Sequence, residues 1–324
     1  MSSPRFWRRD ASILLPALLA PAAGLYRLGF LARRAGAKPH RARVPVICVG
    51  AATVGGAGKT PLTFALALRL RQQGRRVHIV ARGYGGSERG PLRVDPQRHL
   101  ATEVGDETLV LTQSAPVWIA RNRAAGVVAA LQDGADVVLL DDGLQNRTIA
   151  RDFSILTIDG ISGFGNGWQL PAGPLREPVA QAAARCQLAV IIGPDEAGVA
   201  ARLPAGLPVL KARIEPTHPQ NLKGRRWFAF CGLGAPDKFR RTIEEMGLDL
   251  AGWREFPDHH RYSEKELDRL RAEAAALKAE LLTTRKDWVR IHPNFRSGLT
   301  SLDILLRIED EAALDRLLKP VLAC

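Results

Sequence analysis

The chain has 324 residues, 46% of them hydrophobic and 24% charged, which predicts two folded domains at roughly 150 residues per domain and argues against intrinsic disorder. A mean hydropathy of -0.08 argues against a protein with many membrane spans, and four cysteines without C-x-x-C spacing argue against a disulfide scaffold or a zinc site and fit a reducing cytosol. The net charge of +13 is typical of proteins that meet an anionic partner, so its position along the chain matters.

The N-terminal segment, residues 1–43, holds most of that charge. It carries nine Lys or Arg against one Asp, a net charge of +8, and leaves only +5 for the other 281 residues. This concentration predicts a segment that meets an anionic surface, followed by an enzyme-like body. Binding of nucleic acid is disfavoured, because the body lacks both the charge and an interleaved aromatic platform.

Residues 11–26 contain no charged side chain and are flanked by Phe6, Trp7 and arginines. As a helix they would span about 24 Å, short of the ~30 Å hydrocarbon core, and two prolines weaken a straight span. We therefore expect a peripheral, monotopic helix that lies in the headgroup region of an anionic leaflet. Two alternatives stay open: a twin-arginine export signal at Arg8 and Arg9, and a helix packed on its own domain.

The body begins with a predicted strand at 46–50, a glycine loop and a helix that ends near Gly74. Further apolar, strand-like runs alternate with helical patterns at 103–114, 121–133 and 177–185. The predicted strands are 77–81, 117–120, 135–140, 153–158 and 188–192. This alternation predicts an α/β fold of the P-loop NTPase type over residues 44–205, with a parallel sheet covered on both faces.

A second alternation of strands and helices predicts a smaller α/β domain over residues 206–324. Its predicted strands are 227–231, 248–255, 280–284 and 302–307, and its predicted helices are 236–246, 263–279 and 310–322. The stretch 203–226 is rich in Pro, Gly and charge, which is typical of a crossing between domains.

The glycine loop predicts a phosphate-binding site, because consecutive backbone N–H groups and a helix N-terminus surround an anion there. The loop consists of Thr53, Val54, Gly55, Gly56, Ala57, Gly58, Lys59 and Thr60. Lys59 would reach the β- and γ-phosphates and the Thr60 hydroxyl would ligate Mg²⁺. Thr53 stands where the usual pattern has its first glycine, and the alternative is a chance glycine-rich turn. A nucleotide site argues against export, because the periplasm lacks ATP.

Two acids directly follow the predicted strand 135–140. Asp141 and Asp142 supply the carboxylates that a P-loop enzyme needs near Mg²⁺, although one of them could instead cap the next turn. The string from Thr284 to Asp287 resembles a guanine-reading motif, but Arg285 occupies the usual Lys position and the segment lies in the predicted second domain. Guanine selectivity is therefore disfavoured.

Taken together, several strings resemble the tetraacyldisaccharide 4'-kinases, the lipid A 4'-kinases of Gram-negative bacteria, over nearly the full length. They are the residues 53–61, ARGYGG at 81–86, VGDE at 104–107, DDGLQ at 141–145, GFGNG at 163–167, LPAGPLRE at 170–177 and FPDH at 256–259. Thr in place of the first P-loop glycine is a feature of that family. The resemblance implies transfer of the ATP γ-phosphoryl group to the 4'-hydroxyl of a membrane-embedded acylated glucosamine disaccharide 1-phosphate. It also implies the cytoplasmic face of the inner membrane and an active site between two α/β domains.

The resemblance implies a catalytic pair, Asp106 and His259, in which a carboxylate steadied by an imidazole accepts the proton of the attacking alcohol. His259 is preferred to His260 because it follows Asp258 in the family's Asp-His pattern. Without the family, Asp106 reads as a helix-capping acid and His259 as one of two loop histidines. Glu107, next to the base, is a candidate Mg²⁺ contact, or a solvated helix acid.

Three residues are candidate substrate contacts. Arg82 and Tyr84 lie in the Arg-Gly-Tyr-Gly string, where a guanidinium suits a phosphate and an aromatic face suits a sugar, or where the glycines simply form a turn. Arg123 is a further phosphate candidate, or an exposed helix arginine. The resemblance gives no role for Asn166, Arg176 and Glu177, which belong to its strings.

The chain departs from the family at two positions. Asn146 stands where the family has His, and Thr108 stands where it has Pro. Neither change removes a proposed metal ligand or the base, so we expect altered local substrate fit rather than altered chemistry.

The sequence therefore favours an Mg²⁺-dependent lipid kinase that uses ATP in a single direct transfer, with no nucleic-acid partner and no obligate protein partner. The alternative is a membrane-recruited P-loop ATPase switch that phosphorylates no metabolite. That class has a signature Lys beside its paired glycines, where this chain has Val54.

Overall fold

The computed structural model describes residues 4–32 and 39–323 and contains two sheets. The larger sheet has the order β13-β8-β7-β6-β1-β5-β2-β4-β3. Its strands are β1 (Val46–Gly50), β2 (Val77–Ala81), β3 (Leu92–Arg93), β4 (Val117–Ile119), β5 (Val137–Asp141), β6 (Phe153–Asp159), β7 (Leu188–Ile192), β8 (Val209–Pro216) and β13 (Ile304–Ile308). From β8 to β4 all neighbours are parallel, and the outer strands β13 and β3 pair antiparallel.

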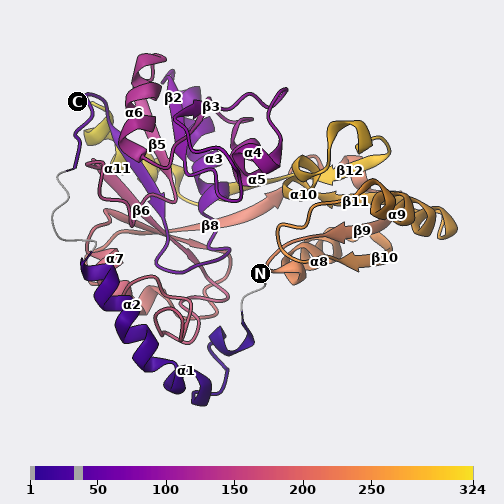
Figure 1. Ribbon diagram of the computed structural model, residues 1–324, viewed down its shortest axis with the longest axis horizontal. Coiled ribbons are helices and arrows are strands. Elements are labelled where there is room, and N and C mark those ends of the chain that lie inside the picture. Colours follow the sequence, from indigo (N-terminus) through magenta and orange to yellow (C-terminus); the bar gives the residue numbers. More distant parts are fainter. Residues whose placement is uncertain (1–3, 33–38, 324) are drawn as a thin grey trace.

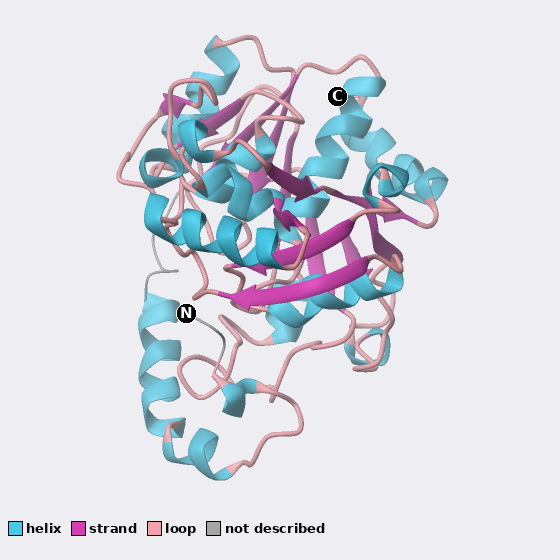
Figure 2. Cartoon of the chain, turned by 90° about the vertical axis from the view of Figure 1, so that its right-hand side faces the viewer, coloured by secondary structure: helices cyan, strands magenta, loops and turns pink. Residues whose placement is uncertain are grey.

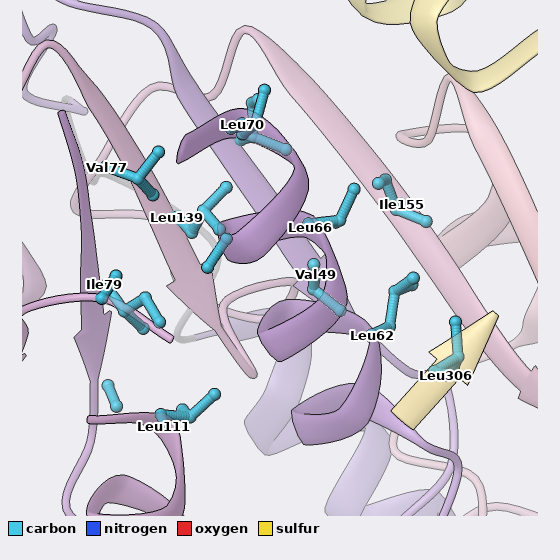
Figure 3. Close-up of a cluster of buried hydrophobic side chains, with 14 of the residues drawn as sticks. Val49, Leu62, Leu66, Leu70, Val77, Ile79, Leu111, Leu139, Ile155 and Leu306 are labelled. Carbon is cyan, nitrogen blue, oxygen red and sulfur yellow. The ribbon is translucent and has the colours of Figure 1, made fainter. Parts of the chain in front are cut away.

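The central strands are buried along their whole length, as their apolar, β-branched sequences predict for a parallel sheet covered on both faces. One face packs against α3 (Lys59–Gln72), α5 (Asp106–Leu111) and α11 (Glu311–Leu322). Figure 3 shows Leu62, Leu66 and Leu70 of α3 on the strand residues of this cluster. The other face packs against α6 (Arg123–Gln132) and α7 (Val179–Ala183). The expected parallel sheet with helices on both faces is confirmed.

The second sheet is smaller and wholly parallel, with the order β10-β9-β11-β12. It contains β9 (Arg226–Cys231), β10 (Asp249–Glu255), β11 (Glu280–Thr284) and β12 (Leu299–Leu302). Helix α8 (Pro236–Glu245) buries its apolar residues on one face and α9 (Glu264–Ala276) on the other. Helix α10 (Arg285–Arg290) follows β11 directly and packs against α5 of the larger unit.

The larger sheet contains strands from beyond the predicted domain boundary at residue 206. The stretch 203–226, expected to be a crossing, contains β8, which pairs with β7 in the larger sheet and points toward the second sheet in Figure 1. The predicted strand 302–307 is two strands in two different sheets, separated at Asp303. The chain then returns through β13 and α11, whose Leu306, Leu314 and Leu318 are buried in the larger core. Periodicity could not show this, because β8 is largely exposed.

The N-terminal segment forms a short 3-10 turn (Arg5–Trp7) and the helices α1 (Leu14–Leu18) and α2 (Ala20–Ala32). These helices extend away from both sheets in the two perpendicular views (Figures 1 and 2). Among the described residues, no helix is both long enough and apolar enough to cross a bilayer. Leu14, Leu18 and Leu25 are strongly exposed, so these helices leave much of their apolar surface uncovered by the rest of the chain.

The segment is attached at its beginning. The Trp7 indole donates to the Pro171 carbonyl at 3.1 Å, and the Asn166 side chain donates to the Phe6 carbonyl at 2.9 Å. The Asn166 backbone N–H donates to the Trp7 carbonyl at 2.9 Å. The glycine-rich string around Asn166 thus holds the start of the N-terminal segment, a role that the sequence did not indicate.

Candidate active site

The phosphate loop lies between β1 and α3, in the strand, loop and helix context that the sequence predicts. Gly55 and Gly58 have φ values of 96° and 77°, which side chains rarely adopt, and a Cβ at Gly58 would meet Ile192 Cδ1 at 2.3 Å. The outer part of the loop is braced by the Val54 N–H, which donates to the Pro174 carbonyl at 2.8 Å. The positive φ values favour glycine at both positions, and the loop leads directly into the N-terminus of α3.

Lys59 and the two acids after β5 lie together because β1 and β5 are neighbours in register, with Val49 opposite Asp141. The Lys59 ammonium is 3.4 Å from the Gly55 carbonyl and 3.9 Å from Asp142 Oδ1. The carboxyl ends of parallel strands meet at one edge of a sheet, so the predicted association of phosphate loop and acids follows from the strand order.

Asp141 is buried and Asp142 half-buried, and the two differ in their electrostatics. Burial, Glu107 and Asp142 raise the pKa of Asp141 to about 7, and its hydrogen bond from Thr63 Oγ1 at 2.9 Å opposes this only in part. Burial also disfavours the charge of Asp142, but Lys59 and Arg176 lower its pKa below the usual value. The Asp141 carboxyl is therefore the one that gains most from a nearby cation.

Arg176, which belongs to a family string without an assigned role, orients Asp142. Its guanidinium donates to both oxygens of Asp142, at 2.7 and 2.9 Å, and to Gln145 Oε1 at 3.0 Å. Gln145 in turn donates to Glu177 at 3.0 Å, and Arg185 pairs with Glu177 at 2.6 Å. These contacts fix the orientation of Asp142 beside the phosphate loop. Asn146, the first departure from the family, accepts hydrogen bonds from Thr148 within its own turn.

Asp106 begins α5 because Gly105 interrupts the helix predicted over 103–114. Gly105 has a φ of 87°, and a Cβ there would lie 2.5 Å from the Tyr84 carbonyl oxygen. The helix is thereby divided into α4 (Ala101–Val104) and α5, with Asp106 and Glu107 in the first turn of the latter. Thr108, the second departure from the family, is buried in α5. The strict requirement for glycine fixes where the two acids project.

His259 approaches Asp106 from the second unit, with its Nδ1 atom 2.9 Å from Asp106 Oδ2. The same oxygen accepts from Arg290 Nε at 2.6 Å, and Oδ1 accepts from the Glu107 N–H at 2.8 Å. Burial would raise the pKa of Asp106, but His259, Lys286 and Arg290 together hold it well below its usual range, so the carboxyl is ionised. His260 instead lies 3.1 Å from Glu266, and it does not contact Asp106.

Arg290 and Lys286, both on α10, are site residues that the sequence reasoning missed. Lys286 Nζ lies 3.1 Å from Glu107 Oε1, and the other oxygen of Glu107 accepts from Thr60 Oγ1 at 3.3 Å. Burial opposes the charge of Lys286, but Glu107 and Asp106 raise its pKa. The available signal was the Thr284 to Asp287 string, considered only as a guanine-reading motif.

Asp287 of that string has a structural function. Its carboxylate is fully buried and accepts from the Tyr262 hydroxyl at 2.8 Å, the Gly232 N–H at 2.9 Å and Arg290 at 2.9 Å. Thr284 caps α10 by accepting from the Asp287 N–H. The string therefore anchors α10 in the second unit and points Lys286 and Arg290 at the larger one.

The three candidate substrate contacts lie in different environments. Tyr84 is exposed, and its ring centroid lies 5.7 Å from that of His259. Arg82 is also exposed, directly after β2. Arg123 is buried, which excludes the alternative of an exposed helix arginine. Burial lowers the pKa of Arg123, and Asp141 and Asp142 oppose this only in part. Its Nε atom has no hydrogen-bond partner among the described residues.

A metal site made of protein side chains alone is not present in residues 4–32 and 39–323, where no three His, Cys, Asp or Glu side chains come together for it. Mg²⁺ commonly binds through one or two carboxylates, with substrate phosphates and waters completing the octahedron. The Thr60 hydroxyl with Glu107 and the raised pKa of Asp141 fit that donor chemistry.

Comparisons with known proteins identify the family of the chain. Residues 15–323 match the family model described as tetraacyldisaccharide-1-P 4'-kinase. The tetraacyldisaccharide 4'-kinase of Rhodospirillum centenum is 48% identical over the whole chain and 97% of the relative. That of Gluconacetobacter diazotrophicus is 50% identical over 98% of the chain and 97% of the relative.

A solved structure, that of LpxK from Aquifex aeolicus in complex with ATP, is 28% identical with a TM-score of 0.78. The similarity covers 95% of this chain and 100% of that one. The chain belongs to the tetraacyldisaccharide-1-P 4'-kinase family.

Proposed function

We propose that the chain transfers the γ-phosphoryl group of ATP to the 4'-hydroxyl of a tetraacyl glucosamine disaccharide 1-phosphate. Family membership supports the kinase activity, and the ATP complex of the Aquifex aeolicus protein supports ATP as the donor. The observation that carries the proposal is local: an ionised, buried carboxylate, Asp106, lies one residue from Glu107, which hydrogen-bonds to Thr60 of the phosphate loop.

In the proposed reaction the 4'-oxygen forms a bond to the γ-phosphorus as the bond from that phosphorus to the β,γ-bridging oxygen breaks, and ADP leaves. The proton of the hydroxyl passes to Asp106, which His259 orients. A carboxylate with a lowered pKa serves here, because the alcohol becomes strongly acidic only as its bond to phosphorus forms. Both partners react directly, so no phosphoenzyme is needed.

The nucleotide would be held by the phosphate loop, with Lys59 directed at the β- and γ-phosphates. Mg²⁺ would be held by Thr60 together with carboxylates from Glu107, Asp141 and Asp142. When bound, the ion neutralises phosphate charge and aligns the transferred group. Arg176 keeps Asp142 oriented in advance, which lowers the cost of assembling this set.

The acceptor would bind beside His259. Tyr84 offers an exposed aromatic face for a sugar ring, and Arg82 offers a guanidinium for the 1-phosphate. Arg123 is placed near the two acids after β5, where a buried cation with a free Nε suits an anionic group. These assignments put the sugar and its phosphate between the two units.

An acylated substrate stays in the bilayer, so the enzyme must reach it there. We propose that α1 and α2 lie on the anionic cytoplasmic leaflet of the inner membrane, with their exposed leucines inserted and the side chains of Arg5, Arg8, Arg9 and Arg27 near the headgroups. Flotation with anionic vesicles tests this: serine at Leu14, Leu18 and Leu25 should abolish binding that the unmodified chain shows. If both proteins float equally, these leucines do not attach the chain to the membrane.

The central test is an assay with purified full-length chain, Mg²⁺-ATP and the tetraacyldisaccharide 1-phosphate in detergent micelles. We expect a lipid product heavier by one phosphate, with one ADP formed per product, detected by mass spectrometry. The matched control is the 4'-deoxy lipid, which should give neither product nor ADP. ADP formed with vesicles alone and without any phosphorylated lipid would instead support the membrane-recruited ATPase switch.

A further inference from the structure

Ion pairs between the two units have a consistent polarity. The larger unit contributes carboxylates, Asp106, Glu107 and Asp159, and the second unit contributes the cations Arg290, Lys286 and Lys238. His259 joins Asp106 from the second unit as well. Among the described residues, the second unit therefore presents cations to carboxylates of the larger unit.

Lys286 lies nearest to the phosphate loop among them. A single carboxylate, that of Glu107, separates its ammonium from the hydroxyl of Thr60, with contacts of 3.1 and 3.3 Å on its two oxygens. Lys59 reaches the same region from the loop itself. A triphosphate held by the loop would thus have one ammonium on each side, one from each unit.

The pair of Lys286 and Glu107 is poorly suited to a purely structural role. The Lys286 side chain is 24% exposed and that of Glu107 42% exposed, so water partly screens this pair, which contributes less to stability than a fully buried pair. The units are already joined by Arg290 and Asp106, each only 4% exposed. Lys286 also has the long, flexible stem that lets an ammonium exchange one anionic partner for another.

The backbone that carries Lys286 is fixed. Asp287, the next residue, is fully buried and accepts hydrogen bonds from Tyr262, Gly232 and Arg290. The ammonium can therefore change partners while its Cα position stays constant. A contact to the transferred phosphoryl group needs a fixed backbone position, and the long Lys286 side chain then allows the ammonium to reach the phosphate.

We propose that Lys286 is a nucleotide-phosphate contact supplied by the second unit: its ammonium leaves Glu107 for the γ-phosphoryl oxygens when ATP binds. The inference rests on the proposed kinase function and deepens it. Lys286 forms no covalent bond; it donates hydrogen bonds to oxygens whose charge shifts as the phosphoryl group moves. Glu107 keeps the ammonium in place before the nucleotide arrives.

The test compares Mg²⁺-ATP and Mg²⁺-ADP binding to the full chain by calorimetry, together with turnover on the lipid. For Lys286→Met we expect the affinity for ATP to fall about tenfold while that for ADP stays unchanged, because only ATP carries the γ-phosphate. Turnover should fall about 100-fold, the typical effect of losing one preorganised donor. Lys286→Arg keeps the charge and should recover much of the preference for ATP.

Two controls make the result decisive. Lys238→Met also removes an ion pair between the units, and it should leave the ratio of ATP to ADP affinity unchanged. Lys265→Met removes an exposed lysine of the same unit and should change nothing. An unchanged ATP to ADP ratio in Lys286→Met, or equal losses in Lys286→Met and Lys238→Met, would overturn the inference. Should Lys286→Met fail to fold, Lys286→Gln replaces it.

Failure of the inference is distinguishable from failure of the proposed function. If the unmodified chain prefers ATP but phosphorylates no lipid, the proposed function is wrong while the affinity ratio still tests Lys286. If the unmodified chain phosphorylates the lipid and Lys286→Met retains the full preference for ATP, the function stands and the inference is wrong.

Discussion

The larger sheet and the second sheet build opposite halves of one site by different means. The larger sheet brings its side chains together through strand order: the phosphate loop after β1 lies beside the acids after β5 because these strands are neighbours. The second sheet supplies cations from α10 and a histidine from a loop, and a buried carboxylate, Asp287, holds α10 in place. One half is determined by topology and the other by a side-chain network.

The ion pairs across the junction also differ in burial. Arg290 and Asp106 are each 4% exposed, whereas the Lys238 side chain is 47% exposed against 9% for Asp159. Burial makes a charge dependent on its partner, because neither water nor salt can replace that partner. The same type of contact should therefore have large consequences at the base and small ones at the edge.

The largest expected effect is at Asp106, the proposed base. Asp106→Asn keeps the size and the accepting oxygen but removes the proton acceptor, so we expect turnover to fall by about 10² to 10⁴. The affinity for ATP should change little, because Asp106 is proposed to accept the proton of the acceptor hydroxyl rather than to bind the nucleotide. Single-turnover kinetics and nucleotide titration measure both.

A matched variant on the phosphate loop sharpens the contrast. Lys59→Ala should weaken nucleotide binding as well as turnover, since its ammonium serves the phosphates rather than the alcohol. Turnover of Asp106→Asn close to that of the unmodified chain would remove Asp106 from the role of base.

The next effect is on stability, at Arg290. Arg290→Met leaves two carboxylates, Asp106 and Asp287, buried without their guanidinium, so the free energy of unfolding should fall by about 3 to 5 kcal/mol. Urea unfolding followed by tryptophan fluorescence measures it. Arg290→Lys keeps a charge but loses the fork, and should lie between the two proteins. A loss below about 1 kcal/mol would show that burial does not control this pair.

The difference between the halves also explains what the sequence could predict. Apolar, β-branched runs and a glycine loop before a helix are local signals, and they predicted the parallel sheet, the loop and the position of Asp141 at a strand end. The chain's return through β8 and β13 was missed, because β8 is largely exposed and Asp303 hides a change of sheet within one apolar run.

The contact between Asp106 and His259 joins residues 153 positions apart, and no local pattern relates them. Only the resemblance to a family placed them together. Lys286 and Arg290 lacked even that guide: the string 284–287 was compared only with a guanine-reading motif, and Arg290 lies outside it. Their function depends on which carboxylates α10 meets in space, and that is a property of the packing of α10 on α5.

A smaller effect on stability is expected at Asp141, a buried carboxyl of the larger sheet. Its pKa rises from an ordinary value of 3.8 to about 7, so the ligand-free protein gains stability from this group as the pH falls from 8 toward 5. Asp141→Asn removes the buried charge and keeps the hydrogen bond from Thr63. We expect it to stabilise the protein by about 1 to 3 kcal/mol at pH 8, since one pKa unit corresponds to about 1.4 kcal/mol.

Urea unfolding without divalent ions at pH 8 and at pH 5.5 measures this effect. At the lower pH the folded Asp141 is already protonated, so the advantage of the variant should shrink. The same advantage at both pH values would contradict a raised pKa at this position. The variant should also respond less to added Mg²⁺ and ATP, because one of the proposed Mg²⁺ carboxylates is lost.

The smallest effect is expected at the edge of the junction. Lys238→Met removes the cation from Asp159, but Asp159 keeps two hydrogen bonds from Ser162, through its N–H and its hydroxyl, each of 2.8 Å. The carboxylate therefore retains partners, and the exposed ammonium was already screened, so the free energy of unfolding should change by less than about 1 kcal/mol. Added salt should reduce even that difference. A loss equal to that of Arg290→Met would mean that the number of ion pairs, rather than their burial, holds the two units together.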